Sequence, residues 1–125
     1  TTVQSDSTYQ VYSVDENILF DTDKATIKPS AAAAIQEIVG SIGQRFAGHD
    51  VRVMGFADSR GDAAYNYDLA KQRAEAVKNY LVETGKMPAD KLSTESFGEQ
   101  QPAATNATAA GRKENRRVEI AVRMK

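Results

Sequence analysis

Residues 55–73 read GFADSRGDAAYNYDLAKQR, and this stretch passes from the end of a β-strand into an α-helix. Residues 51–58, VRVMGFAD, overlap its start and alternate in the manner of a strand, and SRGD at 59–62 breaks that strand. Asp62 is suited to cap the helix, because its carboxylate can accept a hydrogen bond from a backbone N–H of the first turn. The apolar positions that follow at helical spacing are Ala70, Ala74, Val77 and Leu81.

Strands and helices alternate on either side of this unit. Residues 9–20 are rich in β-branched and aromatic residues, which is typical of one or two short strands, here broken near Asp15 and Glu16. A helix is predicted from about Ser30 to Phe46, where apolar residues recur at helical spacing. The remaining segments are a strand at 91–98, a polar loop rich in Ala and Thr at 99–115, and a final strand from 117.

The order of these elements predicts the fold class. Strands joined through helices favour parallel pairing, and one layer of helices on a sheet buries the apolar faces of both. The last strand has one apolar face, which suits a sheet with one solvated face. We therefore expect an α/β fold, an α+β two-layer sandwich of order βαβαββ, with helices packed on one face of a mixed four-stranded sheet. Residues 1–8 are interpreted as a flexible N-terminal segment or linker and residues 9–125 as the domain.

The composition narrows the class of protein. At 125 residues the chain is long enough for one domain with a hydrophobic core. A net charge of −1 argues against binding to nucleic acid, and the absence of cysteine excludes disulfides and thiolate metal sites. No apolar run is long enough to cross a bilayer. We interpret the chain as a mature or excised soluble domain, with any membrane anchor of its parent protein outside this sequence.

Asp58 and Arg73 are the candidate site residues that the residue pattern itself indicates. Asp58 stands at the carboxyl end of a strand, where open α/β sheets bind ligands. Arg73 shares a helix face with Asn66 and Leu69, next to the apolar stripe, so its guanidinium needs an anionic partner. One interpretation is a structural ion pair between Asp58 and Arg73. The other is a pocket in which the carboxylate holds an ammonium and the guanidinium a carboxylate, as suits a zwitterion. Sequence spacing leaves both open.

Four motifs resemble the OmpA-like domain family. Residues 55–81, GFADSRGDAAYNYDLAKQRAEAVKNYL, are similar to its pattern G-H-T-D-x-x-G, Y-N-x-x-L-S-x-x-R-A and V-x-x-Y-L. The segments ILFDTDKATIKP (18–29), LSTESFGEQQP (92–102) and GRKENRRVEIAV (111–122) resemble its first strand and loop, its third strand with G-E-x-x-P, and its closing strand. The resemblance covers about residues 10–124.

The resemblance implies non-covalent binding of peptidoglycan in the periplasm, through the diaminopimelate of the stem peptide. Such a module would anchor an outer-membrane or envelope protein to the cell wall, with no enzymatic activity and no cofactor. Asp58 and Arg73 match the family's aspartate and arginine, which would hold the ammonium and the carboxylate of the ligand. The other matching positions around the pocket are Asn66, Leu69, Thr22 and Asp23.

The sequence also departs from the family pattern. Phe56 and Ala57 stand where His and Thr are usual, and Ala70 stands where Ser is common. If the missing Thr hydroxyl served the ligand directly, its loss would weaken binding by about 0.5–1.5 kcal/mol. Arg60 lies on the same loop and is expected to have only a weak direct role.

The sequence is also compatible with two other classes of function. The first is a protein-interaction or signalling module on the same fold, in a stator, secretion system or lipoprotein, with wall binding weak or gated by a partner. The second is a hydrolase with Asp58 as base, which ranks last because it would need a second placed carboxylate, a metal or a nucleophile. His49 stands alone in a turn, and DTD at 21–23 lacks the spacing of a calcium loop. Arg116 and Arg117 are predicted to pair with acids across the sheet.

Overall fold

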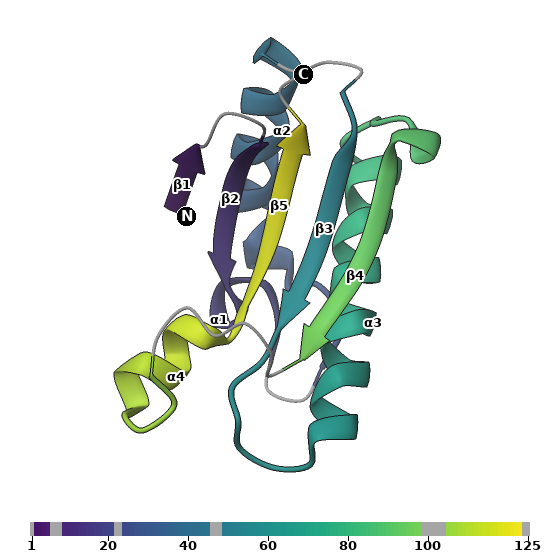
Figure 1. Cartoon of the computed structure of the whole chain (residues 1–125). Helices are drawn as coiled ribbons and strands as arrows, with labels where there is room; N and C mark the ends of the chain where they lie inside the picture. The colour runs from purple at the N-terminus through teal and green to yellow at the C-terminus, as the bar shows by residue number, and fades with distance from the viewer. Residues whose placement is uncertain (1, 6–8, 22–23, 46–48, 99–104, 124–125) are drawn as a thin grey trace.

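The alternating strands and the apolar helix stripes form two layers, a sheet and two long helices that cover one of its faces (Figure 1). This arrangement is seen in a computed structural model of the chain. The structure describes residues 2–5, 9–21, 24–45, 49–98 and 105–123. The two-layer α/β architecture expected from the sequence is confirmed.

The sheet contains the four expected strands and one more. The expected strands are β2 (Tyr9–Asp15), β3 (Val51–Phe56), β4 (Leu92–Gly98) and β5 (Arg117–Arg123). β1 (Thr2–Ser5) adds a fifth at the edge, so residues 2–5 are paired with β2 where a linker was expected. The strand order is β1-β2-β5-β3-β4. β4 is parallel to β3, and β5 is antiparallel to its neighbours β2 and β3.

Two long helices form the second layer. They are α2 (Ala32–Arg45), which follows a 3-10 turn at Pro29–Ala31, and α3 (Ala63–Glu83). The prediction that Asp62 caps α3 is confirmed, because its carboxylate accepts a hydrogen bond of 3.0 Å from the backbone N–H of Tyr65. A second 3-10 turn, Ala89–Lys91, leads into β4. Within the described residues, no helix combines the length and the apolar character needed to cross a membrane.

Two short helices differ from the sequence expectation. α1 (Glu16–Leu19) begins where only a break between strands was expected. α4 (Ala109–Asn115) occupies the end of the segment that was interpreted as a loop, so that interpretation was wrong for 109–115. The local signal is an N-cap, because the Thr108 side chain accepts a 3.0 Å hydrogen bond from the backbone N–H of Gly111. α4 has too few apolar residues for a periodicity argument to detect it. Residues 99–104 lie outside the described part of the chain.

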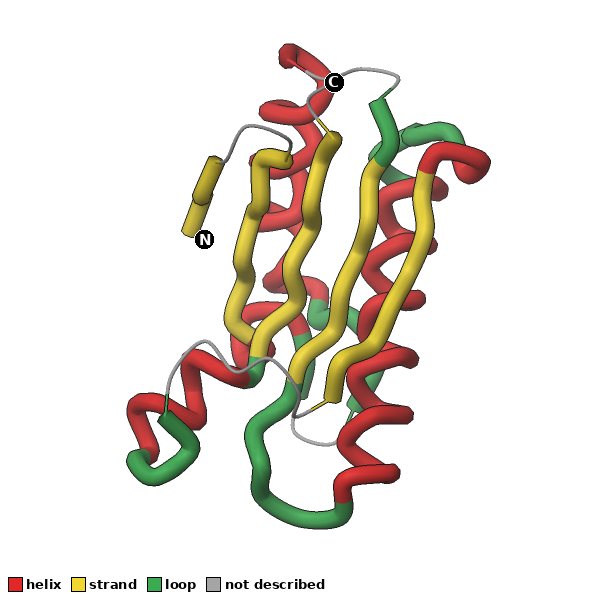
Figure 2. Tube along the Cα trace, in the orientation of Figure 1, coloured by secondary structure: helices red, strands yellow, loops and turns green. Residues whose placement is uncertain are grey.

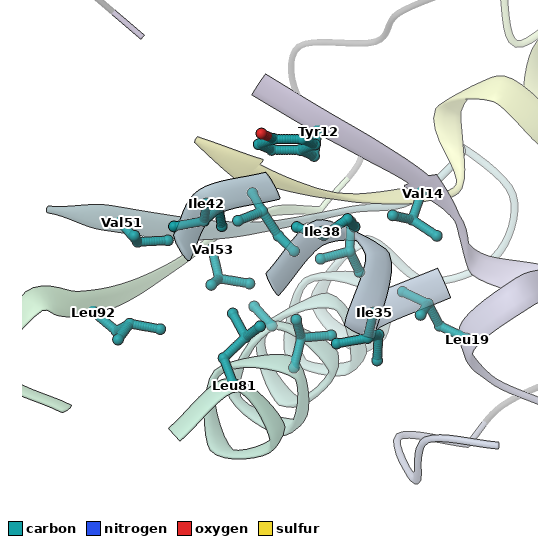
Figure 3. Packing of buried hydrophobic residues seen from close by; sticks show 14 of the residues in the cluster. Tyr12, Val14, Leu19, Ile35, Ile38, Ile42, Val51, Val53, Leu81 and Leu92 are labelled. Atoms are coloured by element: carbon teal, nitrogen blue, oxygen red, sulfur yellow. The ribbon is translucent and has the colours of Figure 1, made fainter. Parts of the chain in front are cut away.

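Apolar side chains of both layers meet in one core (Figure 3). Branched side chains of β3 and the inner strands face those of the two long helices, which removes both sets from water. Residues that are nearly inaccessible to solvent include Val14, Ile35, Ile38, Val53 and Leu81. The core thereby holds α2 and α3 against a single face of the sheet.

α3 approaches β3 unusually closely, and this approach positions the functional end of the sheet. A Cβ atom on Gly55 would lie 2.1 Å from the carbonyl oxygen of Ala70, so only a residue without a side chain fits there. One strand further, the Ser96 hydroxyl donates a 2.8 Å hydrogen bond to the carbonyl oxygen of Tyr67. The first half of α3 is therefore held directly against the ends of β3 and β4.

Candidate functional site

Three segments that are distant in sequence meet at one end of the sheet because of the strand directions (Figure 2). β5 is antiparallel to β2 and β3, so its start lies beside their carboxyl ends. Glu16 follows β2, Asp58 lies just beyond β3, and Arg116 precedes β5. The backbone N–H of Glu16 donates a 3.0 Å hydrogen bond to the carbonyl oxygen of Arg116, which joins two of these segments directly.

A pocket of about 450 Å³ lies at this end, between these segments and the first half of α3. Its charged lining residues are Glu16, Asp58, Arg60, Arg73 and Arg116. The lining contains three guanidinium groups and two carboxylates, so it carries one excess positive charge. This charge favours a ligand with an anionic group. The uncharged lining includes Phe56, Ala57, Tyr65, Asn66 and Leu69.

Asp58 is buried, with 5% of its surface exposed, and its carboxylate is surrounded by donors. Oδ1 accepts the backbone N–H of Arg60 at 2.8 Å. Oδ2 accepts the Arg116 guanidinium at 2.6 Å and the Arg60 guanidinium at 3.0 Å. Burial alone would raise the pKa of Asp58, but these hydrogen bonds outweigh burial and hold the pKa below its usual value. The group is therefore ionised at neutral pH.

Arg73 is equally buried and is held by a different set of partners. Nη1 lies 2.8 Å from Oε2 of Glu16. Nε donates to the carbonyl oxygen of Lys24 at 2.9 Å, and Nη2 donates to that of Asp21 at 3.4 Å. The guanidinium also lies over the ring of Phe20, 5.1 Å from its centroid. These contacts orient the guanidinium plane beside the pocket.

The ion pair between Asp58 and Arg73 that one interpretation required is wrong for this structure. Each residue pairs with another charge, and Arg116 stands between the two pairs, since its Nε lies 4.0 Å from Oε2 of Glu16. The result is an alternating series of charges: Asp58, Arg116, Glu16 and Arg73. Asp58 and Arg73 therefore line one pocket, and neither is the ion-pair partner of the other.

The other candidate site residues differ in where they lie relative to the pocket. Asn66 and Leu69 both line the pocket. The Asn66 amide donates to the carbonyl oxygen of Arg60 at 2.6 Å, which fixes the loop that carries Asp58. Arg60 also lines the pocket and contacts Asp58, and its weak direct role toward a ligand stays a prediction. Thr22 and Asp23 lie outside the described residues, so their expected place beside the pocket stays a prediction.

Sequence reasoning missed Glu16 and misplaced Arg116. The sequence pattern indicates Glu16 only as part of a break after a strand, although an acid at a strand end is the same signal that marks Asp58. Arg116 was expected to pair across the sheet, whereas it pairs at the sheet's end with Asp58 and Glu16. Arg117 pairs with Glu119 of its own strand and stacks on Phe56, with 3.8 Å between the guanidinium carbon and the ring centroid.

The lowered pKa of Asp58 predicts a pH-dependent contribution to stability. A carboxylate with a depressed folded-state pKa stabilises the fold above its unfolded pKa, near 3.8, and loses that effect as the pH falls through its folded pKa. Asp58→Asn should lower the free energy of unfolding by about 2 kcal/mol at pH 7. The deficit should shrink as the pH falls below the unfolded pKa of 3.8, which urea unfolding of both proteins at each pH would measure. A deficit as large at pH 3 as at pH 7 would contradict the assignment.

The one histidine of the chain is not among the residues that line the pocket. His49 hydrogen-bonds through Nδ1 to the carbonyl oxygen of Arg123, 2.6 Å away, at the opposite end of β3 from Asp58. Within the described residues, no three His, Cys, Asp or Glu side chains are grouped so that they could hold a metal ion. The charged lining of the pocket suits binding through charge complementarity.

Comparison with known sequences gives one family and partial matches to longer proteins. A family model described as OmpA family matches residues 19–116. Photosystem I P700 chlorophyll a apoprotein A2 of Gloeobacter violaceus is 40% identical over 114 residues, covering 86% of this chain and 13% of that protein. Outer membrane porin F of Pseudomonas fluorescens is 39% identical over 113 residues, covering 90% of this chain and 34% of that protein. The chain thus spans about a third of the porin and less of the other relative.

The fold is also similar to a solved structure over nearly its whole length. The cell wall anchor of the T6SS from Pseudomonas aeruginosa matches with a TM-score of 0.89 and 29% sequence identity. The match covers 99% of this chain and 87% of that one. The likeness therefore includes the sheet, both long helices and the end of the sheet that carries the pocket.

Proposed function

Because the chain belongs to the OmpA family, we propose that it binds peptidoglycan non-covalently through the diaminopimelate residue of the stem peptide. Its similarity to a cell wall anchor supports attachment to the wall in general. The finer proposal rests on one observation: Asp58 and Arg73 line the same pocket, and each is oriented by a different partner. A carboxylate and a guanidinium presented in this way are complementary to a zwitterion.

The free end of diaminopimelate is such a zwitterion, with an ammonium and a carboxylate on one carbon. Asp58 is ionised and would accept the ammonium. A guanidinium has five N–H donors, of which Arg73 uses three on Glu16, Lys24 and Asp21 among the described residues. The described residues leave two donors of Arg73 unused, and these would serve the ligand carboxylate. The excess positive charge of the residues that line the pocket also favours the ligand carboxylate.

The proposal places the module in the periplasm as a binding rather than catalytic domain. A part of the parent protein outside this chain would attach it to the outer membrane, in keeping with the similarity to an outer membrane porin. The domain would then hold that protein to the cell wall, alone or together with another envelope protein.

Sedimentation with purified sacculi tests the proposal. Wild-type protein is expected to pellet with sacculi, and Asp58→Ala to bind at least tenfold more weakly, since a hydrogen bond to a charged group is worth about 1.5–3 kcal/mol. Asp90→Ala is the matched control, because Asp90 is an exposed acid in the turn before β4, far from the pocket. It should pellet like the wild type.

Wild-type protein that stays in the supernatant would contradict wall binding and would favour the interaction or signalling module. Release of soluble fragments from the sacculi over time would contradict a purely binding role. Circular dichroism of each variant checks that lost binding does not reflect lost folding.

A further inference from the structure

Arg60 makes two separate contacts with Asp58, and they differ in how easily they can be broken. Its backbone N–H donates to Oδ1 at 2.8 Å, a contact built into the loop. Its guanidinium donates to Oδ2 through Nε at 3.2 Å and Nη2 at 3.0 Å. The Arg60 side chain is 60% exposed, so the guanidinium can leave Oδ2 and return to water at small cost.

Arg116 contacts the same oxygen but is held more firmly. Its Nη1 lies 2.6 Å from Oδ2 of Asp58, and its side chain is only 21% exposed. Its Nε faces Glu16, and its carbonyl oxygen accepts the backbone N–H of Glu16. Displacing this guanidinium would leave a partly buried charge with only the more distant Glu16 as its acid, which is costly. Of the two cations on Oδ2, Arg60 is the exchangeable one.

Each carboxylate oxygen offers about two lone-pair sites. On Asp58, Oδ1 accepts one backbone N–H and has one site left, whereas Oδ2 already receives the guanidinium groups of both arginines that line the pocket beside it. A ligand ammonium at Oδ2 therefore has to take the place of one of them. The difference in exposure decides which one leaves.

We propose that Arg60 is an affinity-setting residue, an internal cation that competes with the ligand's ammonium for Asp58. This inference rests on the proposed function of the pocket. The ligand ammonium replaces the Arg60 guanidinium on Oδ2. The net binding free energy gained at this oxygen is therefore smaller than it would be if no cation had to leave. Binding through the carboxylate end is not subject to this competition, because Arg73 draws on other partners.

Two ligands that differ in one charge test the inference. The first is the tripeptide L-alanyl-γ-D-glutamyl-meso-diaminopimelic acid, and the second is the same peptide with only the free amine of its diaminopimelate residue acetylated. Each is titrated calorimetrically into wild-type protein, Arg60→Gln and Arg60→Lys. Arg60→Gln should bind the free-amine peptide about two- to fivefold more tightly than the wild type does, the range expected for removing a partly exposed ion pair.

The controls separate competition from a structural effect. The acetylated peptide should bind Arg60→Gln no more tightly than the wild type, and Arg60→Lys should resemble the wild type because it keeps a cation near Oδ2. Equal or weaker binding of the free-amine peptide to Arg60→Gln would overturn the inference while leaving wall binding intact. A wild-type protein that binds neither this peptide nor sacculi would overturn the proposed function and the inference together.

Discussion

Arg73→Met is expected to abolish binding to sacculi and to lower the free energy of unfolding by about 3 kcal/mol. The Arg73 side chain is 6% exposed and that of its partner Glu16 is 14% exposed. Removing the guanidinium leaves a mostly buried carboxylate without its main counter-charge, and it also removes donors from the carbonyl groups of Lys24 and Asp21. The effect on binding follows because Arg73 would hold the ligand carboxylate.

A double-mutant cycle with Glu16→Gln separates the two effects. If the cost of Arg73→Met comes from a stranded charge, Glu16→Gln should recover part of the stability in the double variant, because the neutral amide needs no counter-charge. Binding to sacculi should stay lost. Urea unfolding and sedimentation measure the two properties independently.

Arg73→Lys is the informative conservative change. It keeps a positive charge beside Glu16 but replaces the planar fork with a single ammonium, which cannot make two parallel hydrogen bonds to a carboxylate. Stability should fall less than in Arg73→Met, while binding should still be strongly reduced. Full binding by Arg73→Lys would show that the fork is not what recognises the ligand.

Gly55→Ala should destabilise the domain by about 3 kcal/mol, a large effect for the addition of one methyl group. The new Cβ would lie 2.1 Å from the carbonyl oxygen of Ala70, and its next neighbours are also backbone atoms of that residue. Backbone atoms cannot avoid the new methyl group by changing rotamer, as a side chain could. α3 therefore has to move away from β3. Binding should weaken too, because Asp58 lies just beyond β3 and Arg73 lies on α3.

Gly40→Ala provides the matched control on the same chemical change. A Cβ on Gly40 meets nothing within 4 Å, and the residue is exposed in the interior of α2. Alanine is favoured over glycine there, so the variant should gain about 0.5–1 kcal/mol. Thermal and urea unfolding of the two variants should shift in opposite directions. Equal shifts would mean that the close approach of α3 to β3 does not limit stability.

Local signals in the chain were sufficient for the central unit of the fold. The alternation at 51–56, the cap at Asp62 and the apolar stripe through Leu81 each depend on neighbours in sequence, and each appears as expected. Asp58 and Arg73 could be placed at one end of the sheet for the same reason, since a strand end and a helix face are local properties. β1 and α4 escaped detection because neither has an apolar periodicity.

The sequence by itself therefore determined the two layers, the order of their main elements and two charged residues of the pocket. Only the tertiary structure decided how those charges are paired. Because β5 lies antiparallel between β2 and β3, Arg116 meets Asp58 and Glu16 although it is distant from both in sequence. Which acid an arginine reaches depends on strand order and on differences of an ångström or two, and no local pattern of residues specifies either of them.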